Sequence, residues 1–169
     1  MLTEARLREI YALYKKELFV YIYRFARSYE VSEDILHDSF ENLIKYSRKY
    51  DLIDANIRSF LYRTAHNLVV NHLKRDRRIT PVTLEEDSSV TGERYIEEAF
   101  ELDELNREIY GHIQSTDEVS RSIFIMSKES GMGIPQIASA LGISERTARR
   151  KLAALIDDLA VHLKKMNFI

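Results

Sequence analysis

Apolar residues recur at intervals of three and four along most of the chain, which is the spacing of one face of an α-helix. This pattern predicts a long amphipathic helix over residues 3–27, with Thr3 available as its N-cap. A second helix is expected to open at Ser32, whose hydroxyl also suits an N-cap. After a polar connector, Ser47–Asn56, a third helix is expected to begin near Ile57.

The third predicted helix keeps an apolar face over more than four turns, so we expect it to form the core of the first domain. Its opposite face combines cations and amides with an aromatic ring. Such a surface suits single-stranded DNA, because bases stack on rings while cations follow the backbone. A solvated helix surface is the alternative. The residues assigned to this face are Tyr62, Arg63, His66, Asn67, Asn71, Lys74 and Arg75.

The helical pattern stops over residues 80–94, where Ser, Thr, Pro, Gly and acidic residues replace it. It resumes over residues 95–113 and again from Asp117 to about Glu129. The sequence therefore predicts an all-α protein with two small helical domains, residues 1–79 and 95–169, joined by an acidic flexible linker.

Residues 133–155 predict two short helices joined by a tight turn. Gly142 tolerates a positive φ at the turn, and Ser144 can cap the second helix. Apolar residues in that helix turn its basic side outward, as in a helix-turn-helix whose recognition helix enters the major groove. An ordinary helical hairpin is the alternative. The candidate DNA-contacting residues are Ser144, Arg146, Thr147, Arg149, Arg150 and Lys151.

The net charge is only −2, but the charged residues are distributed unevenly along the chain. Residues 1–80 carry 15 Lys and Arg against 11 Asp and Glu, residues 81–118 carry 2 against 12, and residues 119–169 carry 8 against 4. Two basic blocks therefore flank an acidic one, which indicates nucleic-acid contact near both ends.

Composition argues against several other classes of protein. The chain has no cysteine, which fits a reducing compartment, and it has no apolar run long enough for a membrane span. Its five histidines are scattered, and neither a Gly-rich phosphate loop nor a nucleophile elbow is present. We therefore expect a soluble cytoplasmic protein without membrane insertion, which is not an enzyme and holds no metal or cofactor.

Three stretches together resemble the extracytoplasmic-function class of bacterial RNA polymerase sigma factors. SEDILHDSF (Ser32–Phe40) is similar to the acidic helix of the family's first domain, region 2. FLYRTAHNLVVNHLKRDRR (Phe60–Arg78) is similar to its next helix, and IPQIASALGISERTARRKL (Ile134–Leu152) to the helix-turn-helix of region 4. The resemblance covers nearly the whole chain.

The resemblance implies a role for each stretch. The acidic helix would bind core RNA polymerase through Asp34, Asp38 and Glu41. The third helix would read the downstream promoter element as a single strand, with a pocket for a flipped base in Ser47–Asn56. The helix-turn-helix would read the upstream element as duplex, and the acidic linker would run toward the polymerase active centre. The single-strand candidates are Tyr62, Arg63, Asn67, Asn71, Lys74 and Arg75.

The function implied is that of a sigma factor, which directs promoter-specific transcription initiation. Its partners would be core RNA polymerase and promoter DNA, and an anti-sigma factor is a further candidate partner. The alternative is a stand-alone helix-turn-helix regulator that binds an operator as a dimer. That alternative leaves the acidic helix and the polar face of the third helix unexplained.

Overall fold

The computed structural model describes residues 1–79 and 104–169, and within these ranges all regular structure is α-helical. The chain divides into two compact units, Met1–Ala99 and Phe100–Ile169, which we describe separately. The all-α prediction is confirmed for the described residues. The linker predicted at residues 80–94 lies outside them, as does the first part of the helix predicted at residues 95–113.

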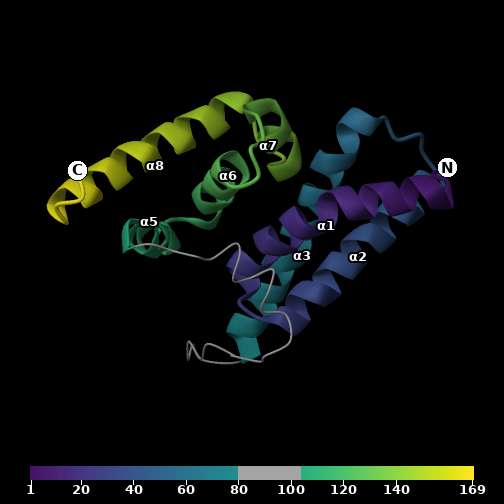
Figure 1. The fold of residues 1–169 in the computed structure, drawn as a ribbon, viewed down its shortest axis with the longest axis horizontal. Coiled ribbons are helices and arrows are strands. Elements are labelled where there is room, and N and C mark those ends of the chain that lie inside the picture. Colours follow the sequence, from purple (N-terminus) through teal and green to yellow (C-terminus); the bar gives the residue numbers. More distant parts are fainter. Residues whose placement is uncertain (80–103) are drawn as a thin grey trace. The chain divides into compact units, whose positions relative to one another are not determined.

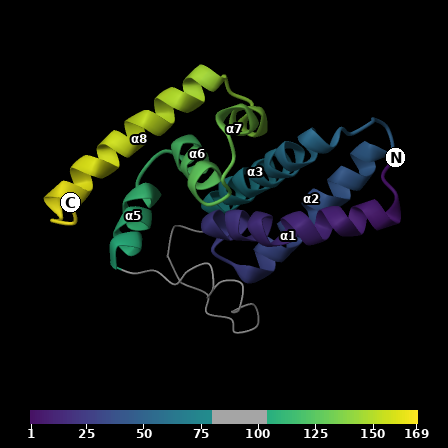
Figure 2. The same ribbon diagram turned by 45° about the horizontal axis from the view of Figure 1, so that its top comes forward.

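The N-terminal unit contains helices α1 (Glu4–Ala26), α2 (Tyr29–Ser47) and α3 (Asp54–Ile79), each of which packs against the other two (Figures 1 and 2). The apolar faces predicted from the sequence meet in the centre of this bundle. The largest of its fully buried aliphatic side chains are Ile10, Leu18, Ile22, Leu43, Ile57 and Leu61.

Side-chain caps fix where the first two helices begin. Thr3 accepts a hydrogen bond from Arg6 N at 3.2 Å, which confirms it as the N-cap of α1. The prediction that Ser32 caps α2 is wrong, because the helix begins one turn earlier. Ser28 is the N-cap and accepts from Val31 N, whereas the buried Ser32 hydroxyl donates to the Ser28 carbonyl at 2.7 Å.

Polar contacts between side chains tie α1 to α3. The Arg58 guanidinium donates to both carboxylate oxygens of Glu17 at 2.9 Å. Deeper in the bundle, the Tyr21 hydroxyl lies 2.8 Å from Nδ1 of His66, and both side chains are buried. A paired charge and a buried hydrogen bond favour one relative orientation of two helices, so these contacts set which side of α3 remains exposed.

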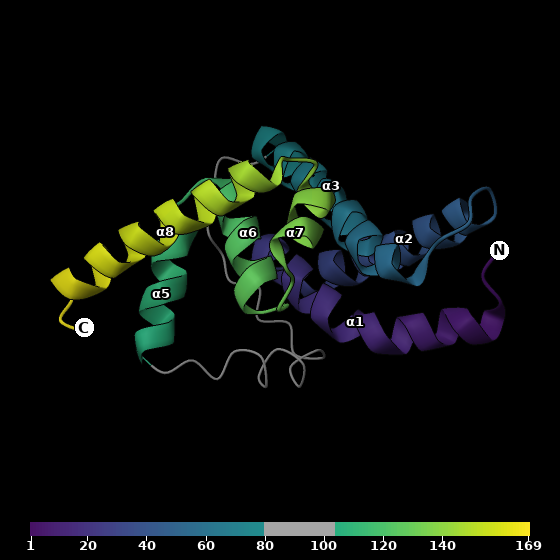
Figure 3. The ribbon, with the colours of Figure 1, turned by 90° about the horizontal axis from the view of Figure 1, so that it is seen from above.

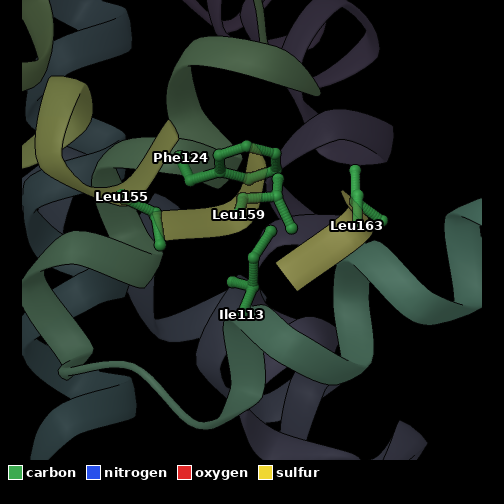
Figure 4. Close-up of a cluster of buried hydrophobic side chains, with 5 residues drawn as sticks. All are labelled: Ile113, Phe124, Leu155, Leu159 and Leu163. Atoms are coloured by element: carbon green, nitrogen blue, oxygen red, sulfur yellow. The ribbon is translucent and has the colours of Figure 1, made fainter. Parts of the chain in front are cut away.

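The C-terminal unit contains α5 (Glu104–Gln114), α6 (Glu118–Lys128), α7 (Ile134–Leu141) and α8 (Glu145–Lys165). The long helix α8 packs against each of the other three (Figure 3). Its C-terminal half contributes three leucines to a buried apolar cluster with α5 and α6 (Figure 4). The members of this cluster are Ile113, Phe124, Leu155, Leu159 and Leu163.

A reciprocal set of histidine contacts also joins α5 to α8. His112 Nε2 donates to Asp158 at 2.7 Å, and His162 Nε2 donates to Glu108 at 2.6 Å. The two imidazole rings stack with their centroids 4.2 Å apart. On each helix the carboxylate precedes the histidine by four residues, so the pairs cross between the helices. This arrangement fastens α5 to the C-terminal half of α8.

Candidate nucleic-acid interface

The helix-turn-helix predicted at residues 133–155 is present. Helix α7 is followed by its C-cap, Gly142, which adopts a φ of 65° in the left-handed region that glycine enters without strain. The Ile143 N–H donates to the Ala138 carbonyl at 3.1 Å and closes the turn. Ser144 then caps α8 by accepting from Thr147 N at 3.1 Å. These local interactions fix the start of the recognition helix.

One side of α8 is buried and the other is basic. Ala148 and Leu155 are buried, and Leu152 packs against the apolar cluster. The exposed side of the first turns carries Arg146, Arg149 and Arg150. The first turns of α8 thus have an apolar side that is buried and a cationic side that is exposed. This N-terminal end is the part of a recognition helix that enters the DNA groove.

Two of the six predicted duplex-contacting residues, Thr147 and Lys151, are half-buried. Both make contacts within the C-terminal unit. The Ser144 hydroxyl donates to Thr147 Oγ1 at 2.9 Å. Lys151 Nζ lies 3.4 Å from the Asp117 carboxylate at the N-terminus of α6. Ser144 itself is exposed, like the three arginines.

The side of α3 assigned to single-stranded DNA is only partly exposed. Five of its predicted residues are exposed: Arg63, Asn67, Asn71, Lys74 and Arg75. Tyr62, however, has no exposed surface, and its ring meets the edge of Tyr21 at 5.2 Å between centroids. His66 is also buried, with 8% of its surface exposed. The outward placement of these two rings was wrong.

These two rings are buried for a physical reason. The helical pattern predicts one buried stripe, but α3 packs against both α1 and α2. Its buried arc is therefore wide enough to include Tyr62 and His66 beside the apolar Leu61 and Ala65. A base could not stack on Tyr62 in this conformation.

Exposed aromatic rings do occur near the polar side of α3, at a place that the sequence analysis missed. Tyr46, near the end of α2, lies 4.7 Å from Tyr50 and 4.9 Å from Phe60 between ring centroids. Tyr46 is 38% exposed and Tyr50 is 57% exposed. They border an open hollow of about 410 Å³. Its lining comprises Asn42, Lys45, Tyr46, Lys49, Tyr50, Phe60 and Thr64.

The exposed polar stripe of α3 begins at the edge of the hollow. Thr64 lines the hollow, and residues three and four positions apart on a helix are neighbours, so Asn67, Asn71 and Lys74 extend the same stripe. The flipped-base pocket was expected within Ser47–Asn56, but of this segment only Lys49 and Tyr50 line the hollow. Two tyrosines four residues apart beside lysines were the available signal in the sequence.

The acidic residues predicted to bind polymerase lie on the exposed side of α2. Asp34 and Asp38 are exposed, and the part of the chain that the structure describes offers neither side chain a hydrogen-bond or ion-pair partner. Glu41 is exposed too, but Lys45 Nζ lies 2.7 Å from its carboxylate. The hydrogen bond from Lys45 and the charge of that ammonium group lower the pKa of Glu41. Asp34 and Asp38 are therefore the more accessible charges.

Residues 1–79 and 104–169 contain no group of three or more histidine, aspartate or glutamate side chains that could hold a metal ion. In the same two ranges, none of the helices has both the length and the apolar character that crossing a bilayer requires.

Comparison with known proteins connects both units to a single family. The model described as Sigma-70 region 2 matches residues 10–79, and the model described as Sigma-70, region 4 matches residues 117–154. A search of curated proteins gave no match.

Two solved structures share the fold. The structure of CnrH in complex with the cytosolic domain of CnrY has 16% sequence identity and a TM-score of 0.67, over 96% of this chain and 90% of that one. The sigma factor RpoE in complex with the anti-sigma factor NepR, from Bartonella quintana, has 14% identity and a TM-score of 0.68, over 93% of this chain and 96% of that one. Because a sigma-70 model matches within each of its helical units, the chain belongs to the sigma-70 family, as a sigma factor of the extracytoplasmic-function class.

Proposed function

We propose that this sigma factor recognises promoters through three separate surfaces while it is bound to core RNA polymerase in the cytoplasm. The acidic side of α2 binds polymerase, the hollow and the exposed stripe of α3 hold the melted downstream element, and the first turns of α8 read the upstream duplex. Once one surface is bound, the other two are held at a high effective concentration near their targets, so that three weak contacts together bind tightly.

The observation that carries this proposal is the continuity between the aromatic hollow and the polar stripe of α3. Tyr46 and Tyr50 offer exposed ring faces on which bases of any sequence can stack. Lys49 and Lys74 supply cations for the backbone, and Asn67 supplies an amide that can bond a base edge. Binding of single-stranded DNA needs this combination of rings, cations and amides. A helix surface that only contacts solvent has no need of exposed rings.

An anti-sigma factor is the further partner that we propose. The solved RpoE structure contains the anti-sigma factor NepR, and the CnrH structure contains the cytosolic domain of CnrY. The shared fold supports a similar partner for this chain, one that would limit its access to polymerase.

Transcription in vitro tests the proposal as a whole. Purified protein would be added to core RNA polymerase on fragmented genomic DNA, and the new transcript starts would be mapped. We expect starts that depend on the protein and share an upstream and a downstream element. Protein that creates no new start, yet binds palindromic duplex without polymerase, would instead be an ordinary regulator.

The polymerase surface can be tested with Asp34→Asn plus Asp38→Asn. We expect the double variant to bind core polymerase about 2- to 30-fold more weakly, because each exposed ion pair contributes about 0.2–1 kcal/mol. Fluorescence anisotropy of labelled protein titrated with core enzyme measures this change. The control, Glu104→Gln plus Asp157→Asn, removes the same charge from exposed sites elsewhere and should bind normally. Equal weakening by both double variants would argue against a specific role for α2.

The aromatic hollow can be tested with Tyr50→Ala. Loss of one stacked base weakens single-strand binding by about 1–3 kcal/mol, so the holoenzyme should bind a single-stranded non-template oligonucleotide about 5- to 150-fold more weakly. Tyr50→Phe keeps the ring and should bind nearly as well as the unmodified protein. If phenylalanine and alanine were equally harmful, the hydroxyl rather than stacking would be responsible, and the proposed role of the hollow would be incorrect.

A further inference from the structure

The cations in the first turns of α8 fall into two groups according to their partners. Arg149 Nη2 lies 3.1 Å from the carboxylate of Glu145, and Lys151 Nζ lies 3.4 Å from that of Asp117. Within the described part of the chain, neither Arg146 nor Arg150 has an ion pair or a side-chain hydrogen bond. Two cations are thus held by carboxylates, and two are available.

The available arginines are well placed to act together. Arg146 and Arg150 are four residues apart, so they lie on the same side of the helix, and both are exposed. An arginine can donate two hydrogen bonds to O6 and N7 of guanine, the commonest base-specific contact in the major groove. These two residues therefore form the natural base-reading pair.

The carboxylate that holds Lys151 is itself fixed. Asp117 caps α6 by accepting hydrogen bonds from Ser120 N at 3.0 Å and from Ser120 Oγ at 2.6 Å. Partial burial alone would raise the pKa of Asp117, but these hydrogen bonds and the charge of Lys151 outweigh it and lower the pKa. Asp117 therefore remains a negative charge at a set position near the recognition helix.

The second carboxylate lies at the N-terminus of the recognition helix, α8. Glu145 is the first residue of α8, and its contact with Arg149 spans one helical turn. A carboxylate is favourable there because of the helix dipole, and it also repels DNA phosphates nearby. While Arg149 is paired with Glu145, this arginine contributes less to phosphate binding.

We propose that Glu145 and Asp117 are specificity-determining residues of the recognition helix. Binding to unrelated DNA depends on the number of cations that reach phosphates, whereas discrimination depends on contacts with base edges. By holding Arg149 and Lys151, the two carboxylates reduce the sequence-independent part of DNA affinity and leave Arg146 and Arg150 to read bases. This inference rests on the proposed role of α8 in reading the upstream element.

Neutral variants of the two carboxylates test the inference in the holoenzyme. The probes are a promoter fragment recovered from the genomic transcription experiment and the same fragment with its upstream element scrambled. For Glu145→Gln and for Asp117→Asn, we expect Kd for the scrambled fragment to fall about two- to fivefold, and Kd for the promoter to change less. The slope of log affinity against log salt should steepen by about one for each released cation. Asparagine is as good an N-cap as aspartate, so α6 should be preserved.

Asp157→Asn is the matched control. It removes one charge from an exposed residue of the same helix, for which the described residues provide no ion-pair partner. It should change affinity for both fragments equally.

Carboxylate variants that leave the ratio of promoter affinity to scrambled-fragment affinity unchanged, or that increase it, would overturn the inference. If Arg146→Ala plus Arg150→Ala also failed to weaken promoter binding, the proposed function of α8 would be wrong as well. A loss of promoter binding in that double variant would leave the proposed function standing.

Discussion

Replacing both Arg146 and Arg150 with alanine is expected to abolish most recognition of the upstream element. Each bidentate contact to guanine contributes about 1–3 kcal/mol, so losing both should weaken binding of matched DNA by about 2–6 kcal/mol. Both side chains are exposed and lie on the face of α8 opposite the apolar cluster, so the fold should tolerate the change. The effect should fall on DNA recognition alone.

Two measurements on the same holoenzyme check this expectation. Affinity for the promoter should approach that for the scrambled fragment, while affinity for core polymerase should be unchanged. Arg146→Lys plus Arg150→Lys is an informative control, because lysine keeps the charge but lacks the planar pair of donors. Full recognition by the lysine variant would mean that these residues bind phosphates and do not read bases.

Replacing Phe124 with alanine is expected to destabilise the C-terminal unit by about 3–5 kcal/mol, the usual cost of removing a buried phenylalanine. Its ring is 7% exposed and lies in the cluster that α6 forms with α5 and α8 (Figure 4). It also meets Tyr110 edge-on, with centroids 6.5 Å apart. Small domains are typically stable by about 5–15 kcal/mol, so this loss would leave α8 poorly held.

Amide hydrogen exchange of the full chain, followed by mass spectrometry, measures this loss for each unit. Peptides from α6 and α8 should exchange much faster, while those from α1 and α3 should keep their protection. Val161→Ala removes apolar atoms from a side chain that is 52% exposed and should have little effect. Faster exchange throughout the chain would contradict independent stability of the two units.

Features determined by neighbouring residues could be predicted from the sequence. The turn of the helix-turn-helix depends on Gly142 and Ser144, whose interactions reach no further than four residues. Thr3 and Asp117 begin their helices through hydrogen bonds to an amide three residues ahead. Such interactions form inside one segment, so the order of residues is enough to specify them.

Features that depend on contacts between helices could not be predicted so well. For α2, Ser32 was the predicted cap, but the helix begins one turn earlier and Ser32 is buried in the bundle. The hollow next to α3 draws its lining from the end of α2, the connector and α3. Tyr46 and Phe60 are distant in sequence and meet only when these helices pack.

The sequence by itself determined the helices, the helix-turn-helix and the exposed cations of α8, because short-range hydrogen bonds and helical periodicity encode them. Only the tertiary structure decided that Tyr62 is buried, that Tyr46 and Tyr50 border an open hollow, and that Lys151 is held by the Asp117 carboxylate. The physical reason is that periodicity defines the faces of a helix, whereas the number and position of neighbouring helices decide how much of each face is covered.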